Sequence, residues 1–148
     1  MTAKDILDAK GGDIVSIAEN ATVFQAVAIL TKYKIGLLIV HTATGRFGDV
    51  ISERDVVQKC VNLKKNPEQV TVNEIMTPRE QVQTGSEEEE IQEIMNTMTE
   101  KKVRHLPIFK GDELKGIISI GDVIKNLLTE KDNEIKTLSG YVSGNYPG

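Results

Sequence analysis

Hydrophobic residues in this chain occur in two kinds of pattern, which follow each other in a regular order. Short continuous apolar runs at 37–40, 106–109 and 114–118 are typical of buried strands. Between them, apolar residues recur every three or four positions at 23–30, 53–61, 91–98 and from 121 onward, which predicts amphipathic helices. Polar turns at 42–45 and 111–112 indicate that strands are joined in pairs.

The predicted elements come in the same order twice, β-α-β-β-α. In the first copy a strand-like segment at 14–17 precedes a helix capped by Thr22, strands at 37–40 and 47–51, and a helix at 53–61. In the second copy a strand at 82–84 precedes a helix for which Ser86 and Glu89 form a capping box. Strands at 106–109 and 114–118 follow, and a last helix begins near Gly121 and stops at Gly140.

The repeat is also visible in the numbering. Ser52 and Ser119 are 67 residues apart, as are Asp55 and Asp122. Ile35 and Val103 are 68 apart, and one extra residue in the turn at 41–48 accounts for the difference. We therefore assign residues 1–62 to a first repeat with its N-terminal segment, 63–75 to a linker, 76–131 to a second repeat, and 132–148 to a helix end and tail. Each half has too few apolar residues to bury its sheet alone, so the halves are expected to pack together.

Composition narrows the class of protein. The chain has 148 residues, of which 39% are apolar and 27% charged, as in a globular domain. No apolar run approaches the ~20 residues that span a bilayer, and the N-terminus lacks a signal-peptide pattern, so no membrane association and a cytoplasmic location are expected. The net charge of -4 argues against nucleic-acid binding. Cys60 is the one cysteine, which excludes an internal disulfide; it is either a buried small hydrophobe or a reactive thiol.

Three segments carry a resemblance to a known family: V-R-H-L-P-I-F, G-I-I-S-I-G-D and S-E-R-D-V. Within tandem β-α-β-β-α units they resemble a pair of CBS domains over nearly the whole chain, with no enzyme or transporter domain attached. The resemblance implies an α/β fold of the α+β kind, with two CBS repeats packed as a pseudo-twofold pair. It also implies homodimers and two clefts for an adenine nucleotide such as AMP, ATP or NAD. The repeats differ where Asp49 aligns with Gly116 and Ile39 with Pro107, so unequal clefts are expected.

Asp55 and Asp122 are the candidates for binding ribose. An ionised carboxylate has two acceptor oxygens, which suit the two hydroxyl donors of a vicinal diol. The simpler interpretation is that each Ser-x-x-Asp is a helix-capping pair, and the two roles are compatible. Ser52 and Ser119 lie at predicted helix starts, where backbone N–H groups favour an anion.

Phosphate binding falls to Arg54, Arg104 and His105. A guanidinium can fork onto phosphate oxygens, and the last two match family positions that contact phosphate. The alternatives are a solvated or salt-bridged Arg54 and a His105 packed between the repeats. Thr77 matches a position that approaches the adenosine from the partner repeat; otherwise it is a turn residue fixed by Pro78.

By family position the adenine lies between apolar walls, and the site residues divide into two clefts. One combines Thr77, Val82, Gln83, Val103, Arg104 and His105 with Ser52, Arg54 and Asp55. The other combines Val15, Ile35, Gly36 and Leu37 with Ser119 and Asp122. Because the first has more cationic groups, we expect it to bind the tighter or more phosphorylated ligand.

The leading functional hypothesis is a regulatory module that senses energy or redox state through an adenine nucleotide and modulates an unidentified partner protein. The sequence holds no nucleophile–base constellation, metal cluster or glycine-rich phosphate loop, so no catalytic activity and no metal are expected. The alternative is a structural dimerisation module without ligand.

Overall fold

The computed structural model describes residues 1–11 and 13–143, with side chains as far as residue 135. The first half holds α1 (Ala3–Lys10), β1 (Ser16–Ala18), α2 (Val23–Tyr33), β2 (Leu37–His41), β3 (Asp49–Ser52), α3 (Glu53–Val56) and the π-helical turn η1 (Val57–Val61). The second half holds α4 (Val72–Ile75), the 3-10 turn η2 (Arg79–Gln81), β4 (Gly85–Ser86), α5 (Ile91–Lys101), β5 (His105–Lys110), β6 (Glu113–Ser119) and α6 (Ile120–Ser143).

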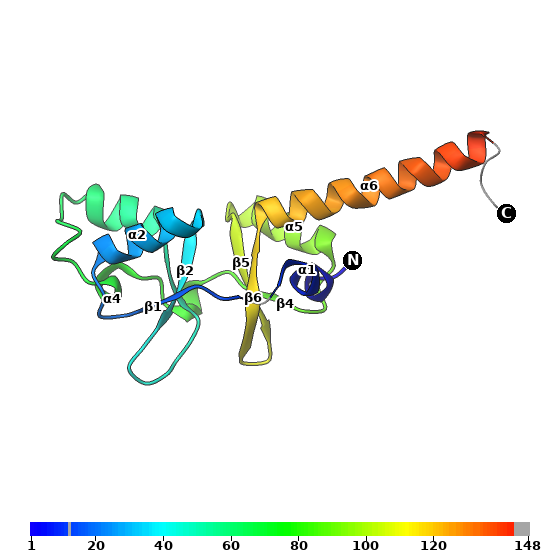
Figure 1. Cartoon of the computed structure of the whole chain (residues 1–148). Coiled ribbons are helices and arrows are strands. Elements are labelled where there is room, and N and C mark those ends of the chain that lie inside the picture. The colour runs from blue at the N-terminus through cyan, green and yellow to red at the C-terminus, as the bar shows by residue number, and fades with distance from the viewer. Residues whose placement is uncertain (12, 144–148) are drawn as a thin grey trace.

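The two halves have the same sheet topology. In the first sheet β2 is central, with β1 parallel and β3 antiparallel to it, and β4, β5 and β6 repeat that arrangement. The sheets lie next to each other, and α6 extends away from the body (Figure 1). The predicted fold of two β-α-β-β-α repeats is therefore confirmed.

Local sequence signals fix several helix ends as predicted. Thr22 and Gln25 form a capping box at the start of α2. Lys34 and Lys102, which are 68 residues apart, end α2 and α5 in the left-handed conformation. Cys60 is fully buried, in agreement with the small-hydrophobe interpretation.

Three local predictions were wrong. The strand expected at 82–84 lies at Gly85–Ser86, and the capping box expected at Ser86 does not start α5, which begins at Ile91. The Ser86 N–H does bond Glu89 Oε1, but the N-terminal residues pair with this segment through Ala3 N–H to Glu89 O and Ile91 N–H to Met1 O. That pairing delays the helix. At the other end α6 continues through Gly140, since a glycine costs a helix only about 1 kcal/mol.

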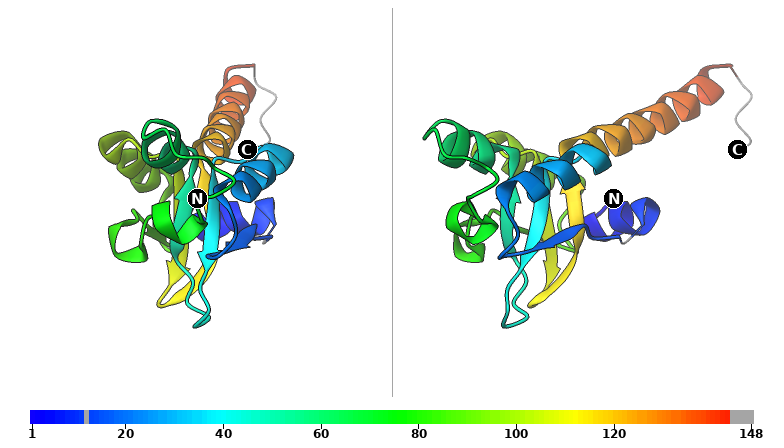
Figure 2. Two further views of the ribbon diagram at one scale, coloured as in Figure 1. Left: turned by 90° about the vertical axis from the view of Figure 1, so that its left-hand side faces the viewer. Right: turned by 60° about the vertical axis from the view of Figure 1, so that its left-hand side comes forward.

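Each half receives a short helix that comes before the other half in sequence. Ala3, Ile6 and Leu7 of α1 lie in the core beneath α5 and α6, while Val72 and Ile75 of α4 lie in the core beneath α2. Figure 2 shows α1 beside β6 of the second repeat. The repeats follow each other along the chain, but their cores are exchanged at these helices.

A third apolar cluster joins the two sheets. Leu37, Ile39 and Val50 of the first sheet form it, packed against Leu114 and Ile117 of the second sheet. This contact holds the repeats face to face and leaves a hollow on each side, where the functional residues lie. In the part of the chain that the structure describes, every helix is too short or too polar to span a membrane.

Candidate ligand-binding clefts

Two hollows lie between the repeats, with cavity volumes of about 210 and 320 Å³. Leu37 and His105, which are 68 residues apart, line both. We name the first cleft one and the second cleft two. Cleft one is lined by Gly36, Leu37, Val50, Ser52, Glu53, Arg54, Asp55, Thr77, Gln81, Val82, Gln83, Val103, Arg104 and His105. Cleft two is lined by Lys10, Gly11, Asp13, Val15, Lys34, Ile35, Leu37, His105, Gly116, Ile117, Ser119 and Asp122.

The structure brings together all nine residues that sequence reasoning placed in the first cleft. Gly36 was assigned to the other cleft but lines cleft one, and the remaining five predicted residues line cleft two. Val50, Glu53 and Gln81 were missed in cleft one. Val50 had a detectable signal, because the 67-residue offset relates it to Ile117, which lines cleft two.

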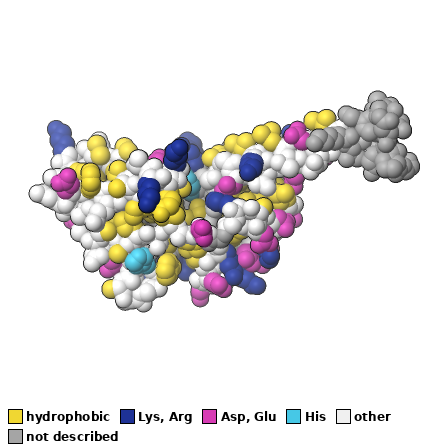
Figure 3. Space-filling model, viewed as in Figure 1, with side chains coloured by type: hydrophobic (Ala, Val, Ile, Leu, Met, Phe, Trp, Pro, Cys, Tyr) yellow, Lys and Arg dark blue, Asp and Glu magenta, His cyan; other side chains and the backbone are white. Residues whose placement is uncertain are grey.

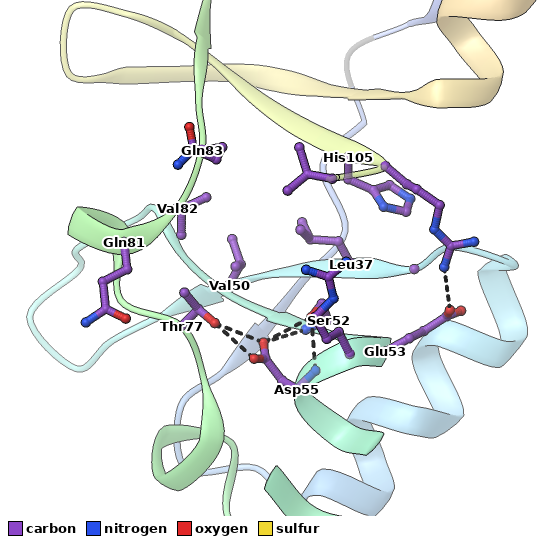
Figure 4. Close-up of a pocket in the computed structure, with 14 residues that line it drawn as sticks. Leu37, Val50, Ser52, Glu53, Asp55, Thr77, Gln81, Val82, Gln83 and His105 are labelled. Atoms are coloured by element: carbon purple, nitrogen blue, oxygen red, sulfur yellow. Dashed lines mark hydrogen bonds and ion pairs between the residues drawn. The ribbon is translucent and has the colours of Figure 1, made fainter. Parts of the chain in front are cut away.

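Asp55 is the polar centre of cleft one and is 5% exposed. It forms a capping box with Ser52: Asp55 Oδ2 accepts the Ser52 N–H at 3.0 Å, and Ser52 Oγ accepts the Asp55 N–H at 3.2 Å. Thr77 Oγ1 donates to Asp55 Oδ1 at 3.0 Å from the opposite side (Figure 4). Lys59 Nζ lies 2.8 Å from the same Oδ1. The capping interpretation is therefore confirmed, and Thr77 is a direct partner of the carboxylate.

The basic residues of cleft one also have protein partners. Arg54 Nη2 donates to the carbonyl oxygen of Lys102 at 2.9 Å, and Arg104 Nη2 lies 3.4 Å from Glu53 Oε2. Both contacts join α3 to the segment that leads into β5. They are exposed, so each guanidinium can turn to a phosphate at small cost. Leu37, Val50 and Val82 form the apolar side of the cleft (Figure 4).

His105 lies where the two clefts meet. A Cβ atom added to Gly36 would be 2.6 Å from His105 Cε1, so the ring packs directly on the backbone of β2's first turn. Burial lowers the pKa of His105 below its ordinary value, and the Arg104 charge adds to the effect while Glu53 opposes it. The ring is therefore neutral at pH 7 and has one N–H to donate.

Asp122 occupies the equivalent place in cleft two and is more accessible, with a side chain that is 23% exposed against 7% for Asp55. It forms the same capping pair, since its Oδ2 accepts the Ser119 N–H at 2.8 Å. Its cation is Lys10 of α1, whose Nζ lies 2.8 Å from Oδ2. Burial alone would raise the pKa of Asp122, but Lys10 and the Ser119 N–H outweigh it and hold that pKa below its ordinary value.

Sequence reasoning missed Lys10, although the repeat contained the signal. Lys10 is 67 residues before Thr77, and both side chains bond the aspartate of the repeat that they do not precede directly. Lys34 was also missed, so cleft two is lined by two lysines where cleft one is lined by two arginines. The expectation that cleft one holds more cationic groups was therefore wrong.

The arrangement in both clefts is a carboxylate at a helix start, apolar walls, and basic side chains within the same hollow. Such a set offers acceptors for a diol, a surface for a flat ring and charges for phosphate. This is the geometry of a nucleotide-binding module placed between two repeats.

The family follows from comparison with known proteins. The family model described as CBS domain matches residues 3–62 and 72–129. The chain therefore belongs to the CBS domain family, and it contains two copies of the domain. CBS domain pairs are regulatory modules that often bind adenosyl ligands.

Similar proteins support the same assignment. A solved structure of a Burkholderia ambifaria protein with CBS domains is 32% identical, with a TM-score of 0.80, covering 87% of this chain and 95% of that one. The mitochondrial CBS domain-containing protein CBSX3 of Arabidopsis thaliana is 28% identical over 98% of this chain and 73% of its own length. A hexameric CBS-CP12 protein from bloom-forming cyanobacteria is 25% identical, with a TM-score of 0.70, over 84% of this chain and 66% of that one.

Proposed function

We propose that this protein is a regulatory module that binds an adenine nucleotide, AMP first and otherwise ADP, ATP or NAD, and thereby modulates a partner protein. The observation that carries the proposal is cleft one. It combines a capped carboxylate, Asp55, with the threonine that contacts it, two arginines and an apolar wall, drawn from both repeats. We infer a binding role and no catalytic one.

In this proposal each part of the nucleotide meets a different side of cleft one. The ribose hydroxyls donate to Asp55, whose carboxylate shares its acceptor positions among Ser52, Thr77 and the ligand. The phosphate lies toward Arg54 and Arg104, which leave Lys102 O and Glu53. The adenine lies against Leu37, Val50 and Val82.

Regulation requires that the ligand bind one arrangement of the repeats better than another. The two exposed contacts that join α3 to the start of β5 are the parts of the structure that a phosphate would replace. Binding therefore exchanges repeat-to-repeat bonds for ligand-mediated ones and shifts how the repeats pack. The partner protein reads that shift.

A thermal-shift screen with AMP, ADP, ATP, NADH and S-adenosylmethionine tests the proposal. A ligand at 100 times its dissociation constant adds about 2.7 kcal/mol. We expect that to raise the melting temperature by roughly 5–10 °C. Arg104→Gln removes a phosphate partner and is expected to reduce the shift with AMP, whereas Lys4→Gln, which changes an exposed pair on α1, leaves it unchanged. No shift with any compound refutes the proposal, and turnover of nucleotide during incubation refutes the non-catalytic part.

A second candidate, a dimerisation module without ligand, is favoured by a surface on the helical side. Val57 and Ile124 are 58% and 46% exposed, Val61 and Leu128 are 60% and 59% exposed, and each pair is related by the 67-residue offset. Hydrophobic atoms reach the surface along α6 in Figure 3. We propose that this surface pairs with a second copy of the chain, as the repeat symmetry makes it self-complementary.

The oligomeric state separates the two candidates. Light scattering on the eluted protein is expected to give a dimer, and Val61→Glu together with Leu128→Glu is expected to give a monomer. A dimer that shows no thermal shift with any nucleotide favours the structural module. A cytoplasmic location remains a prediction, and the Arabidopsis relative is named as mitochondrial.

A further inference from the structure

Lys10 is a cation that the N-terminal helix places inside cleft two. Its ammonium donates to Asp122 Oδ2 at 2.8 Å and to the carbonyl oxygen of Ile117 at 2.7 Å. The helix behind it is fixed, because Leu7 packs against Gly116, where an added Cβ would be 2.7 Å from Leu7 Cδ2. The lysine side chain itself is 39% exposed, so its end can move while the helix stays in place.

This contact occupies the acceptor that a ribose would need. Asp122 Oδ2 already accepts the Ser119 N–H and the Lys10 ammonium. A ribose diol bound to this carboxylate competes with the ammonium for it. Adenosine alone gives the displaced ammonium nothing in return, whereas a ligand with a phosphate offers it a new anionic partner.

We propose that Lys10 makes cleft two select phosphorylated adenosyl ligands over adenosine, an inference that rests on the nucleotide-binding function proposed above. In the free protein the ammonium neutralises Asp122. On binding it leaves Asp122 for the ligand phosphate, while the diol takes its place. The other charged or titratable groups that line the cleft are Asp13, Lys34 and His105.

Cleft one is built differently and serves as the internal control. The lysine that pairs with Asp55 is Lys59, four residues further along the same helix, and it also bonds Ile75 O and Thr77 Oγ1. Lys59 is not among the residues that line cleft one. Selectivity in cleft one therefore depends on Arg54 and Arg104 and is independent of Lys10.

Titrations followed by ¹⁵N NMR can measure the two clefts separately in one protein. The Gly116 amide reports on cleft two and the Gly36 amide on cleft one. AMP and adenosine are titrated into the wild type, Lys10→Met and Lys10→Arg, with Lys4→Met as a control of equal charge on the same helix. We expect Lys10→Met to reduce the preference of cleft two for AMP over adenosine by about tenfold, the effect of one charge-assisted bond. Lys10→Arg and Lys4→Met should keep the preference.

The outcomes distinguish this inference from the function on which it rests. If AMP shifts Gly116 in the wild type and Lys10→Met leaves the AMP-to-adenosine ratio unchanged, the role of Lys10 is refuted and the nucleotide site stands. If no nucleotide shifts Gly36 or Gly116, both are refuted. Spectral dispersion shows whether Lys10→Met is folded, and Lys10→Gln, which keeps a donor without the charge, provides the second variant.

Discussion

Comparison of the two clefts shows which features of the duplication were kept and which were replaced. Both clefts keep a serine at the helix start and an aspartate three residues later, joined by the same capping bonds. In cleft one the carboxylate is buried and held by a hydroxyl and a lysine from its own helix. In cleft two it is more open and held by a lysine from α1.

The difference teaches that the charge of the aspartate, more than any one partner, is what the fold conserves within this chain. The position in the second repeat that corresponds to Lys59 is Asn126, whose side chain bonds the carbonyl oxygen of Asp122 instead. Lys10 supplies the missing ammonium from a different element. Cleft one therefore has a rigid acceptor and cleft two an adjustable one.

The largest expected effect of this difference is on stability. We expect Asp55→Ala to reduce the free energy of unfolding by about 2–3 kcal/mol, since it removes a cap and a buried, multiply bonded carboxylate. Asp122→Ala should cost about 1 kcal/mol, because a more exposed ion pair contributes less. Urea denaturation of both variants measures this. Equal losses would show that the two carboxylates have the same structural weight.

Gly36 gives the next largest effect, because its backbone supports His105. Gly36→Ala places a Cβ 2.6 Å from the ring and is expected to cost about 1–3 kcal/mol. In a His105→Ala background the same substitution should cost less than about 0.5 kcal/mol, which a double-mutant cycle measures. Gly121→Ala, with its nearest neighbour at 3.6 Å, is the control and should not destabilise. Equal costs in both backgrounds would show that the ring is free to move away.

The sequence predicted the elements that depend on local pattern. The strands at 37–41 and 105–119, the capping pairs at Ser52 and Ser119, and the offset of 67 residues follow from spacing and side-chain chemistry, and the structure has them. The order of strands in each sheet followed from the resemblance to the family and was confirmed by the topology.

What the sequence did not predict depends on contacts between distant segments. The start of α5 is set by backbone pairing with Met1 and Ala3, which lie some 90 residues earlier. The placement of α1 in the core of the second repeat is likewise a tertiary choice, and it alone puts Lys10 beside Asp122. Applying the offset to Thr77 would have pointed to Lys10, but a lysine and a threonine do not suggest the same role.

A smaller effect should separate the two residues that the offset relates. Thr77→Val removes the hydroxyl that donates to buried Asp55 and is expected to cost about 1 kcal/mol. Lys10→Met removes an exposed ion pair and should cost about 0.5 kcal/mol or less. Chemical denaturation of both variants checks the order. If Lys10→Met costs more, the ammonium is structural and the adjustable acceptor of cleft two is disproved.

The smallest effect is the pH dependence that His105 introduces where the clefts meet. Because the folded state lowers the pKa of His105, the unfolded chain takes up the proton first, and protonation favours unfolding. The free protein should therefore lose stability as the pH falls below the ordinary histidine value of 6.5, and regain it as the pH rises. His105→Gln removes this contribution, so the difference between wild type and variant isolates it from other groups. Urea midpoints at several pH values between 5 and 7.5 measure that difference. A difference that stays constant over this range, or one that favours the wild type at low pH, would show that Glu53 and Asp122 outweigh burial and the positive charges of Arg104 and Lys10 around the ring.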